Sequence, residues 1–312
     1  MVQLKTVSPL QVAPALLVVL FLVSNAFSQI SSAEVAYASH PVVASAEHAA
    51  LEEVATGNKL AVAGRWPEAA AAYRRAIDLA PNSTTALANL GYAYSQLNRL
   101  EDAREPLQRA LALAPNNAVA AYNLGNVYLR LGRTAESIEL LQSAIKLRPH
   151  FFEALNDLGN AFSELGKHDE AVAALRQAVQ LRADSALAHH NLGAVYSAAK
   201  RFSEAAESLQ TAASLGPDDG QTYGDLGLVY LQLNRFELAR QALERAVRLT
   251  PKDVRAQYHL GAAYLKLKKE DSFWRQYAVV KTLEPGLAKQ LYDAFYRNRL
   301  LTLPSKEKDG QQ

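Results

Sequence analysis

Apolar residues recur along most of the chain at steps of three and four, the spacing that places them on one face of an α-helix. In the stretch AYNLGNVYLRLGR, residues 121–133, this face contains Leu124, Val127 and Leu131. Gly125 lies within the same face, although glycine in a helix interior costs about 1 kcal/mol relative to alanine. The pattern therefore predicts a helix that keeps an unfavourable residue on the side that it buries.

This glycine recurs every 34 residues, seven times in succession. The seven positions are Gly57, Gly91, Gly125, Gly159, Gly193, Gly227 and Gly261. Five further columns are each kept in six of the seven units: a leucine before the glycine, an aromatic residue three positions after it, small residues at twelve and nineteen positions, and a proline at twenty-four. A fixed period of this length indicates an array of structural repeats.

Each repeat contains two helical patterns, separated by a break at the seventh residue after the glycine. Glycine, asparagine or lysine stands at the break, and a basic residue such as Arg99 or Arg133 follows. Acidic residues such as Asp102 open the second helix. The positive charge at the end of the first helix and the negative charge at the start of the second both interact favourably with the helix dipoles. We therefore interpret these charges as helix-end chemistry rather than as a binding stripe. One helix pair cannot bury its own apolar face, and stacking on neighbouring pairs supplies the partner.

The columns of leucine, glycine, aromatic, small and proline residues closely resemble the tetratricopeptide repeat family. The resemblance implies an all-α, right-handed superhelical solenoid of antiparallel helix pairs with a concave groove. It predicts seven units, at residues 50–83, 84–117, 118–151, 152–185, 186–219, 220–253 and 254–287. A C-terminal cap helix at residues 288–303 and a disordered tail at residues 304–312 complete the prediction.

The composition agrees with a folded chain. Of 312 residues, 49% are apolar and 21% are charged, as in ordinary globular proteins. The net charge of +2 provides no overall field for nucleic acid. The absence of cysteine excludes disulfides, thiolate metal sites and cysteine nucleophiles.

The first 33 residues contain one charged side chain, Lys5, followed by an apolar run over residues 12–23 and the small or polar residues SNAFSQ. This order is typical of a secretory signal peptide. We therefore expect a signal peptide at residues 1–28, a partly helical linker at residues 29–49, and export to the periplasm or medium. The alternative is an uncleaved membrane anchor, although a spanning helix needs about 20 apolar residues.

No catalytic constellation is evident. The sequence has neither a His-Glu-x-x-His zinc motif nor a Gly-x-Ser-x-Gly nucleophile elbow. The segment GNAFSELGK, residues 159–167, has the wrong glycine spacing for a phosphate-binding loop and continues with histidine rather than serine or threonine. The repeats also fill most of the chain. We predict a non-catalytic protein with no cofactor and no metal.

The residue two positions before each repeated glycine is mostly polar. This column reads Ala55, Asn89, Asn123, Asp157, Asn191, Asp225 and His259. The resemblance implies that the column faces the groove, as it does in the similar asparagine ladder of a protein glycosyltransferase. Because an amide both donates and accepts, such a ladder could pair with the backbone of an extended peptide. The alternative is that asparagine is simply the commonest residue in this column of the family.

The candidate peptide-binding residues are the polar and aromatic side chains expected on the groove. They are Asn89, Tyr122, Asn123, Asn126, Asn156, Asp157, Asn160, His190, Asn191 and Asp225. The basic residues that the family uses to clamp chaperone tails are absent from the corresponding positions. We predict a scaffold in the cell envelope whose partner is a protein or peptide, with no nucleic acid and with membrane contact only through a retained N-terminus. The alternative function is a structural part of an envelope secretion or polysaccharide-export assembly, acting by self-association or stacking.

Overall fold

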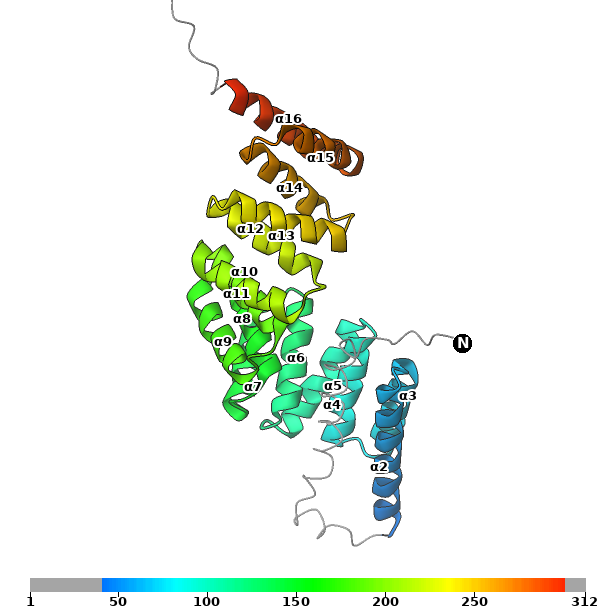
Figure 1. Ribbon diagram of the computed structural model, residues 1–312. Coiled ribbons are helices and arrows are strands. Elements are labelled where there is room, and N and C mark those ends of the chain that lie inside the picture. Colours follow the sequence, from blue (N-terminus) through cyan, green and yellow to red (C-terminus); the bar gives the residue numbers. More distant parts are fainter. Residues whose placement is uncertain (1–40, 301–312) are drawn as a thin grey trace, which may run out of the picture. The chain divides into compact units, whose positions relative to one another are not determined.

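The computed structural model describes residues 41–300, which form fifteen α-helices and no strand (Figure 1). The helices follow one another as seven pairs and a final helix, so the chain is an all-α solenoid, as predicted. The predicted signal peptide or anchor at residues 1–28, residues 29–40 of the predicted linker, residues 301–303 of the predicted cap helix and the predicted tail at residues 304–312 lie outside the described residues. Among the helices that the structure describes, none combines the length and apolar character needed to cross a bilayer.

The chain divides into two compact units, at residues 1–161 and 162–312, and the helix α8 (Phe152–Glu164) contains the boundary. The helices that precede α8 are α2 (Pro41–Val62), α3 (Trp66–Leu79), α4 (Thr84–Gln96), α5 (Leu100–Leu113), α6 (Ala118–Arg130) and α7 (Thr134–Leu147). The helices that follow it are α9 (His168–Leu181), α10 (Ala186–Ala198), α11 (Phe202–Leu215), α12 (Gly220–Gln232), α13 (Phe236–Leu249), α14 (Val254–Lys266), α15 (Glu270–Leu283) and α16 (Pro285–Leu300). Helix α2 begins inside the segment predicted as a partly helical linker, and α16 occupies the place of the predicted cap.

The break between the two helices of each repeat is a single residue with positive φ. Asn98 and Lys200 have φ values of 58° and 60°, and Gly132 has 74°. This left-handed conformation stops the first helix and favours glycine or asparagine. In several repeats the basic residue that follows packs over the aromatic ring of its own repeat: the Arg99 guanidinium carbon lies 4.6 Å from the centroid of Tyr94. Arg99 also donates to Asp102 at 2.7 Å.

The same packing recurs in both units. The Arg133 guanidinium lies 4.3 Å from the Tyr128 ring centroid, and that of Arg201 lies 4.7 Å from Tyr196. A cation over an aromatic face is attracted by the ring quadrupole. The basic column is therefore helix-end chemistry, as predicted, with an aromatic contact that the sequence analysis did not anticipate.

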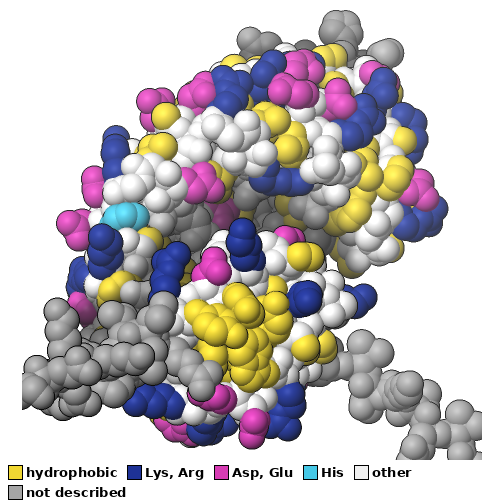
Figure 2. Space-filling model, turned by 90° about the horizontal axis from the view of Figure 1, so that it is seen from above, with side chains coloured by type: hydrophobic (Ala, Val, Ile, Leu, Met, Phe, Trp, Pro, Cys, Tyr) yellow, Lys and Arg dark blue, Asp and Glu magenta, His cyan; other side chains and the backbone are white. Residues whose placement is uncertain are grey.

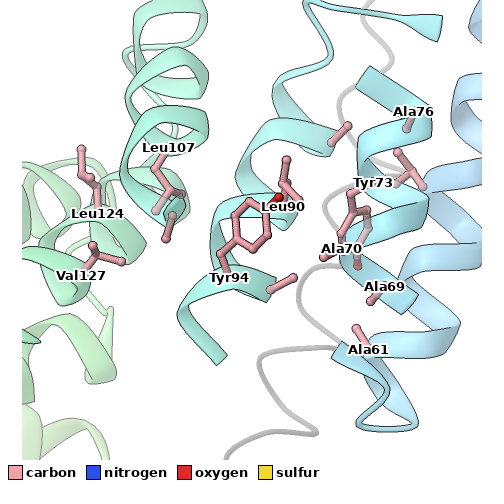
Figure 3. Close-up of a cluster of buried hydrophobic side chains, with 14 of the residues drawn as sticks. Ala61, Ala69, Ala70, Tyr73, Ala76, Leu90, Tyr94, Leu107, Leu124 and Val127 are labelled. Carbon is pink, nitrogen blue, oxygen red and sulfur yellow. The ribbon is translucent and has the colours of Figure 1, made fainter. Parts of the chain in front are cut away.

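The core of each repeat is closed by one large side chain that packs on the repeated glycine. A Cβ atom at Gly91 would lie 2.4 Å from Leu107 Cγ, and a Cβ at Gly227 would lie 2.4 Å from Leu243 Cγ. The buried side chains of the first repeats, Leu107 among them, form one cluster (Figure 3). The glycines thus permit the close approach of two helices, which offsets their poor helix propensity.

The last repeat is closed differently. A Cβ atom at Gly261 would meet Leu291 Cδ1 at 2.9 Å, and Leu291 belongs to α16 rather than to the second helix of the repeat. Phe295 of α16 stacks on Phe273 of α15 with ring centroids 5.0 Å apart. Helix α16 therefore caps the apolar end of the array, as terminal elements of repeat proteins must.

Candidate binding face

The first helices of successive repeats lie side by side within each unit: α4 contacts α2 and α6, and α12 contacts α10 and α14. Within each unit we call the surface formed by these helices its first-helix face, and the residues of α8 up to Ala161 are counted with the first unit. Each sequence-predicted site residue belongs to the first-helix face of its own unit. The structure divides them into buried amides and half-buried polar clusters.

Three of the predicted amides are buried. Asn89, Asn123 and Asn156 are 2%, 5% and 5% exposed. Asn89 donates through Nδ2 to Asn58 Oδ1 at 3.0 Å, and the same oxygen accepts the Tyr73 hydroxyl at 2.8 Å. Asn89 therefore satisfies polar groups inside the protein and fastens the second repeat to the first. Contact of these three amides with a peptide stays a prediction.

A second polar cluster in the first unit centres on Asp157, which is half-buried on α8. Asn126 donates through Nδ2 to Asp157 Oδ2 at 3.1 Å. Tyr122 and Asn156 also hydrogen-bond the Asp157 carboxylate. Burial raises the pKa of Asp157, because it disfavours the charged form, while these hydrogen bonds oppose the change. The structure thus brings together four of the predicted residues.

Tyr122 occupies the apolar side of this cluster. Its ring packs against Phe151 with centroids 4.9 Å apart and an interplanar angle of 46°. Its pKa is raised well above the usual value, first by burial and then by the Asp157 charge. Tyr122 remains half-buried, so the cluster joins an aromatic surface to a carboxylate.

The two polar contacts share one spacing. Asn58 and Asn89 are 31 residues apart, as are Asn126 and Asp157. Each pair joins the residue after one repeated glycine to the residue two before the next glycine. The sequence analysis missed this pairing and missed Asn58, although reading both columns together could have found them.

In the second unit the structure brings His190 and Asp225 together. His190 Nδ1 lies 2.8 Å from Thr222 Oγ1, and Nε2 lies 3.7 Å from Asp225 Oδ2. Burial raises the pKa of Asp225, and the nearby charges of His190 and Arg255 oppose this. Asn160 and Asn191, the remaining predicted residues, are half-buried on α8 and α10.

A pocket of about 440 Å³ opens between α12 and α14. It is lined by Gln221, Gly224, Asp225, Leu228, Thr250, Asp253, Arg255, Ala256 and His259. Burial lowers the pKa of His259, and the positive charge of Arg255 lowers it further, so this imidazole is neutral at pH 7. Of the lining residues, the sequence analysis selected only Asp225 as a binding candidate. Gln221, Arg255 and His259 could have been found, because Gln221 and Arg255 occupy one repeat column and Asp225 and His259 another.

The cap carries an aromatic surface. Tyr292 and Tyr296 of α16 are 42% and 43% exposed, and Tyr277 and Trp274 of α15 lie next to Tyr292. Figure 2, which is seen from above the view of Figure 1, shows a compact hydrophobic patch on the face turned to the viewer. A terminal element with a polar outer face keeps a repeat array soluble, so an exposed aromatic patch is unusual.

Within residues 41–300, no group of three or more histidine, aspartate or glutamate side chains is placed to hold a metal ion. The described site is instead a set of hydrogen-bonding groups, aromatic rings and a charged pocket on stacked helix pairs. These features define a helical repeat protein of the kind that serves as an interaction scaffold.

The chain belongs to the tetratricopeptide repeat family. Its sequence matches the tetratricopeptide repeat over residues 54–118, 89–150, 122–186 and 156–220, and a TPR repeat over residues 227–268. The family has the fold of a protein-interaction scaffold, and its members generally bind protein or peptide partners. No protein of curated function matches the sequence.

Solved structures share the fold. PilF of Pseudomonas aeruginosa is 22% identical with a TM-score of 0.60, over 68% of this chain and 96% of PilF. The C-terminal part of a TPR repeat-containing protein from Cytophaga hutchinsonii is 14% identical with a TM-score of 0.61, over 77% and 98% of the two chains. YrrB, described as a TPR protein with an unusual peptide-binding site, is 23% identical with a TM-score of 0.53, over 60% and 96%.

Proposed function

We propose that the protein is a non-catalytic scaffold that captures an extended peptide segment of a partner on its first-helix face. The observation that carries the proposal is the set of half-buried polar and aromatic side chains on successive first helices. Tyr122, Asn126 and Asp157 form one such set, and His190 and Asp225 form another. Rigid helices hold these groups in place, which reduces the entropy lost on binding.

The likeness to YrrB supports the proposal at the level of the fold, since a protein of this architecture is described as having a peptide-binding site. The buried amides support a refinement of the amide-ladder hypothesis. Asn89 is engaged with Asn58, so we expect half-buried candidates outside the ladder column, Asn126, Asn160 and His190, to make the contacts instead.

Selection from a displayed library of random linear peptides tests this proposal. We expect the wild-type protein to enrich peptides, and the variant Asn126→Ala/Asn160→Ala/His190→Ala to lose most of that enrichment while its helical circular dichroism is kept. A matched control, Glu139→Ala/Lys146→Ala, changes exposed residues of the second helix α7. If only the control lost binding, the second-helix surface would be the binding face and the proposal would be wrong.

We propose further that the protein acts outside the cytoplasm after cleavage of residues 1–28. The support is the order of basic, apolar and small residues in that segment, which lies outside the described residues. N-terminal sequencing of the protein from the envelope fraction tests it. A mature start at Phe27 or Gln29 supports cleavage, and an intact Met1 in the membrane fraction supports the anchor.

The aromatic patch on the cap favours a second candidate function, assembly through self-association. The exposed Tyr292 and Tyr296 would be covered by a second copy of the chain. Light scattering over a range of concentrations tests this candidate. A concentration-dependent oligomer that Tyr292→Ser/Tyr296→Ser abolishes supports it, and a monomer at every concentration contradicts it.

A further inference from the structure

Gly224 is a glycine that neither packing nor backbone geometry requires. A Cβ atom there would meet only Asp253 Oδ2, at 4.0 Å, whereas a Cβ at Gly227 on the same helix would collide with Leu243. Its φ also lies outside the left-handed region. Glycine nevertheless costs about 1 kcal/mol in a helix interior relative to alanine. The glycine therefore leaves space on the surface of α12 at the expense of helix propensity.

The space is part of the pocket between α12 and α14. Gly224 stands three residues before its repeated glycine, in the column that holds Tyr122, His190 and Tyr258 in other repeats. The volume of about 440 Å³ lies within the range of pockets that bind small ligands. The missing side chain thus contributes to a pocket on the first-helix face.

Carboxylates outnumber permanent cations in the lining of this pocket. Asp225 comes from α12, and Asp253 precedes α14, where its Oδ1 caps the backbone N–H groups of Arg255 and Ala256. The other oxygen of Asp253 is the atom nearest to the vacant Cβ position of Gly224. Arg255 is the one permanent cation of the lining, and no Lys or Arg among the described residues forms an ion pair with Asp225 or Asp253.

Part of the pocket lining is apolar. Leu228 and Ala256 belong to the same pocket. A Lys or Arg side chain combines a charged head with an apolar stem, so it matches a pocket with both kinds of surface. A carboxylate ligand fits less well, because Arg255 is exposed and two carboxylates share the site with it.

We propose that this pocket receives the Lys or Arg side chain of a peptide bound on the first-helix face. The head group lies between Asp225 and Asp253, and the stem packs on Leu228 and Ala256. The inference rests on the proposed peptide-binding function and adds the side chain that the partner presents. A charge-assisted hydrogen bond of this kind is stronger than a neutral one.

The test compares peptides selected from the random library by four forms of the full chain. These are the wild type, Gly224→Leu, which fills the pocket, Asp225→Asn, which removes a charge, and Asp218→Asn, the matched control at an exposed turn. We expect the wild type and the control to select peptides with Lys or Arg at a fixed position. We expect Gly224→Leu and Asp225→Asn to select peptides without that preference.

Synthetic copies of a selected peptide then measure how much its Lys or Arg contributes to the affinity. Replacing its Lys or Arg by Gln should weaken binding to the wild type about tenfold or more, because a partly desolvated charge pair is lost. The same replacement should change binding to Asp225→Asn by much less. Circular dichroism and thermal unfolding check that Gly224→Leu and Asp225→Asn are folded.

The outcomes separate the two proposals. A wild-type protein that enriches no peptide overturns the proposed function and this inference with it. Enrichment without a preference for Lys or Arg overturns the inference alone. A preference for Asp or Glu that Arg255→Gln removes also overturns it, and shows that Arg255 governs the pocket.

Discussion

Leu107 fills the space that a side chain at Gly91 would need, since a Cβ atom there would lie 2.4 Å from Leu107 Cγ. Leu107 is fully buried and cannot move without disturbing the cluster drawn in Figure 3. We therefore expect Gly91→Ala to destabilise the protein by about 1–3 kcal/mol, the usual cost of overpacking. Chemical denaturation measures this loss. A stabilised Gly91→Ala variant would contradict the assigned packing.

Gly224→Ala should have the opposite sign. The added methyl group enters open space, so only the helix propensity changes, by up to about 1 kcal/mol in favour of alanine. Measured under the same conditions, it serves as the control for Gly91→Ala. Equal destabilisation of both variants would show that any side chain at a helical glycine lowers the stability of this protein, whatever the packing around that glycine.

The positive φ at the break between helices gives a third prediction. Gly132 has a φ of 74° and no atom within 4 Å of its missing Cβ, so Gly132→Ala should cost about 1–2 kcal/mol through backbone strain alone. Lys200 adopts the same conformation with a φ of 60°. Lys200→Gly should relieve the strain and leave stability unchanged or slightly increased. Thermal unfolding of both variants is the measurement, and a strong loss in Lys200→Gly would contradict the explanation.

The buried carboxylate of Asp157 gives a prediction about pH. Burial raises its folded-state pKa above the usual value of 3.8, so between these two pKa values the folded protein binds more protons than the unfolded chain. The contribution of this group to stability therefore falls as pH rises through that window. We expect wild type to gain stability relative to Asp157→Asn as pH is lowered from 7 towards 4.

Denaturant midpoints of both proteins across this range test the prediction, because their difference cancels the other carboxylates. Several exposed glutamates, Glu136 among them, have a lowered pKa through bonding to arginine and act in the opposite direction. A pH-independent difference between wild type and variant would contradict the raised pKa of Asp157.

The fold could be predicted because the same columns recur, each with at most one exception, through seven repeats. Gly125 was predicted to lie on the side that its helix buries, and it does. The side chain nearest to its missing Cβ atom is Leu141, rather than one of the small residues twelve and nineteen positions after the glycine. A large residue stands sixteen positions after every repeated glycine, so this column could also have been found in the sequence.

The candidate site was less predictable, since its contacts cross from one repeat to the next. The column that contains Asn89 shows that it is polar, but its partner, Asn58, belongs to a different column in the preceding repeat, so neither column alone predicts the contact. Gly224 was missed for a different reason. Binding residues are recognised in a sequence by their side chains, whereas Gly224 contributes to the pocket because it has none.

The contact between Gly261 and Leu291 determines how the repeat array could be lengthened. In the inner repeats a leucine of the same repeat, such as Leu107 or Leu243, packs against the glycine. In the last repeat Tyr277 stands at that position, and Leu291 of α16 packs against Gly261 instead. The last repeat is therefore incomplete without the helix that follows it. An array lengthened by copies of residues 254–287 would therefore need, after its last copy, a helix that supplies a side chain in the place of Leu291.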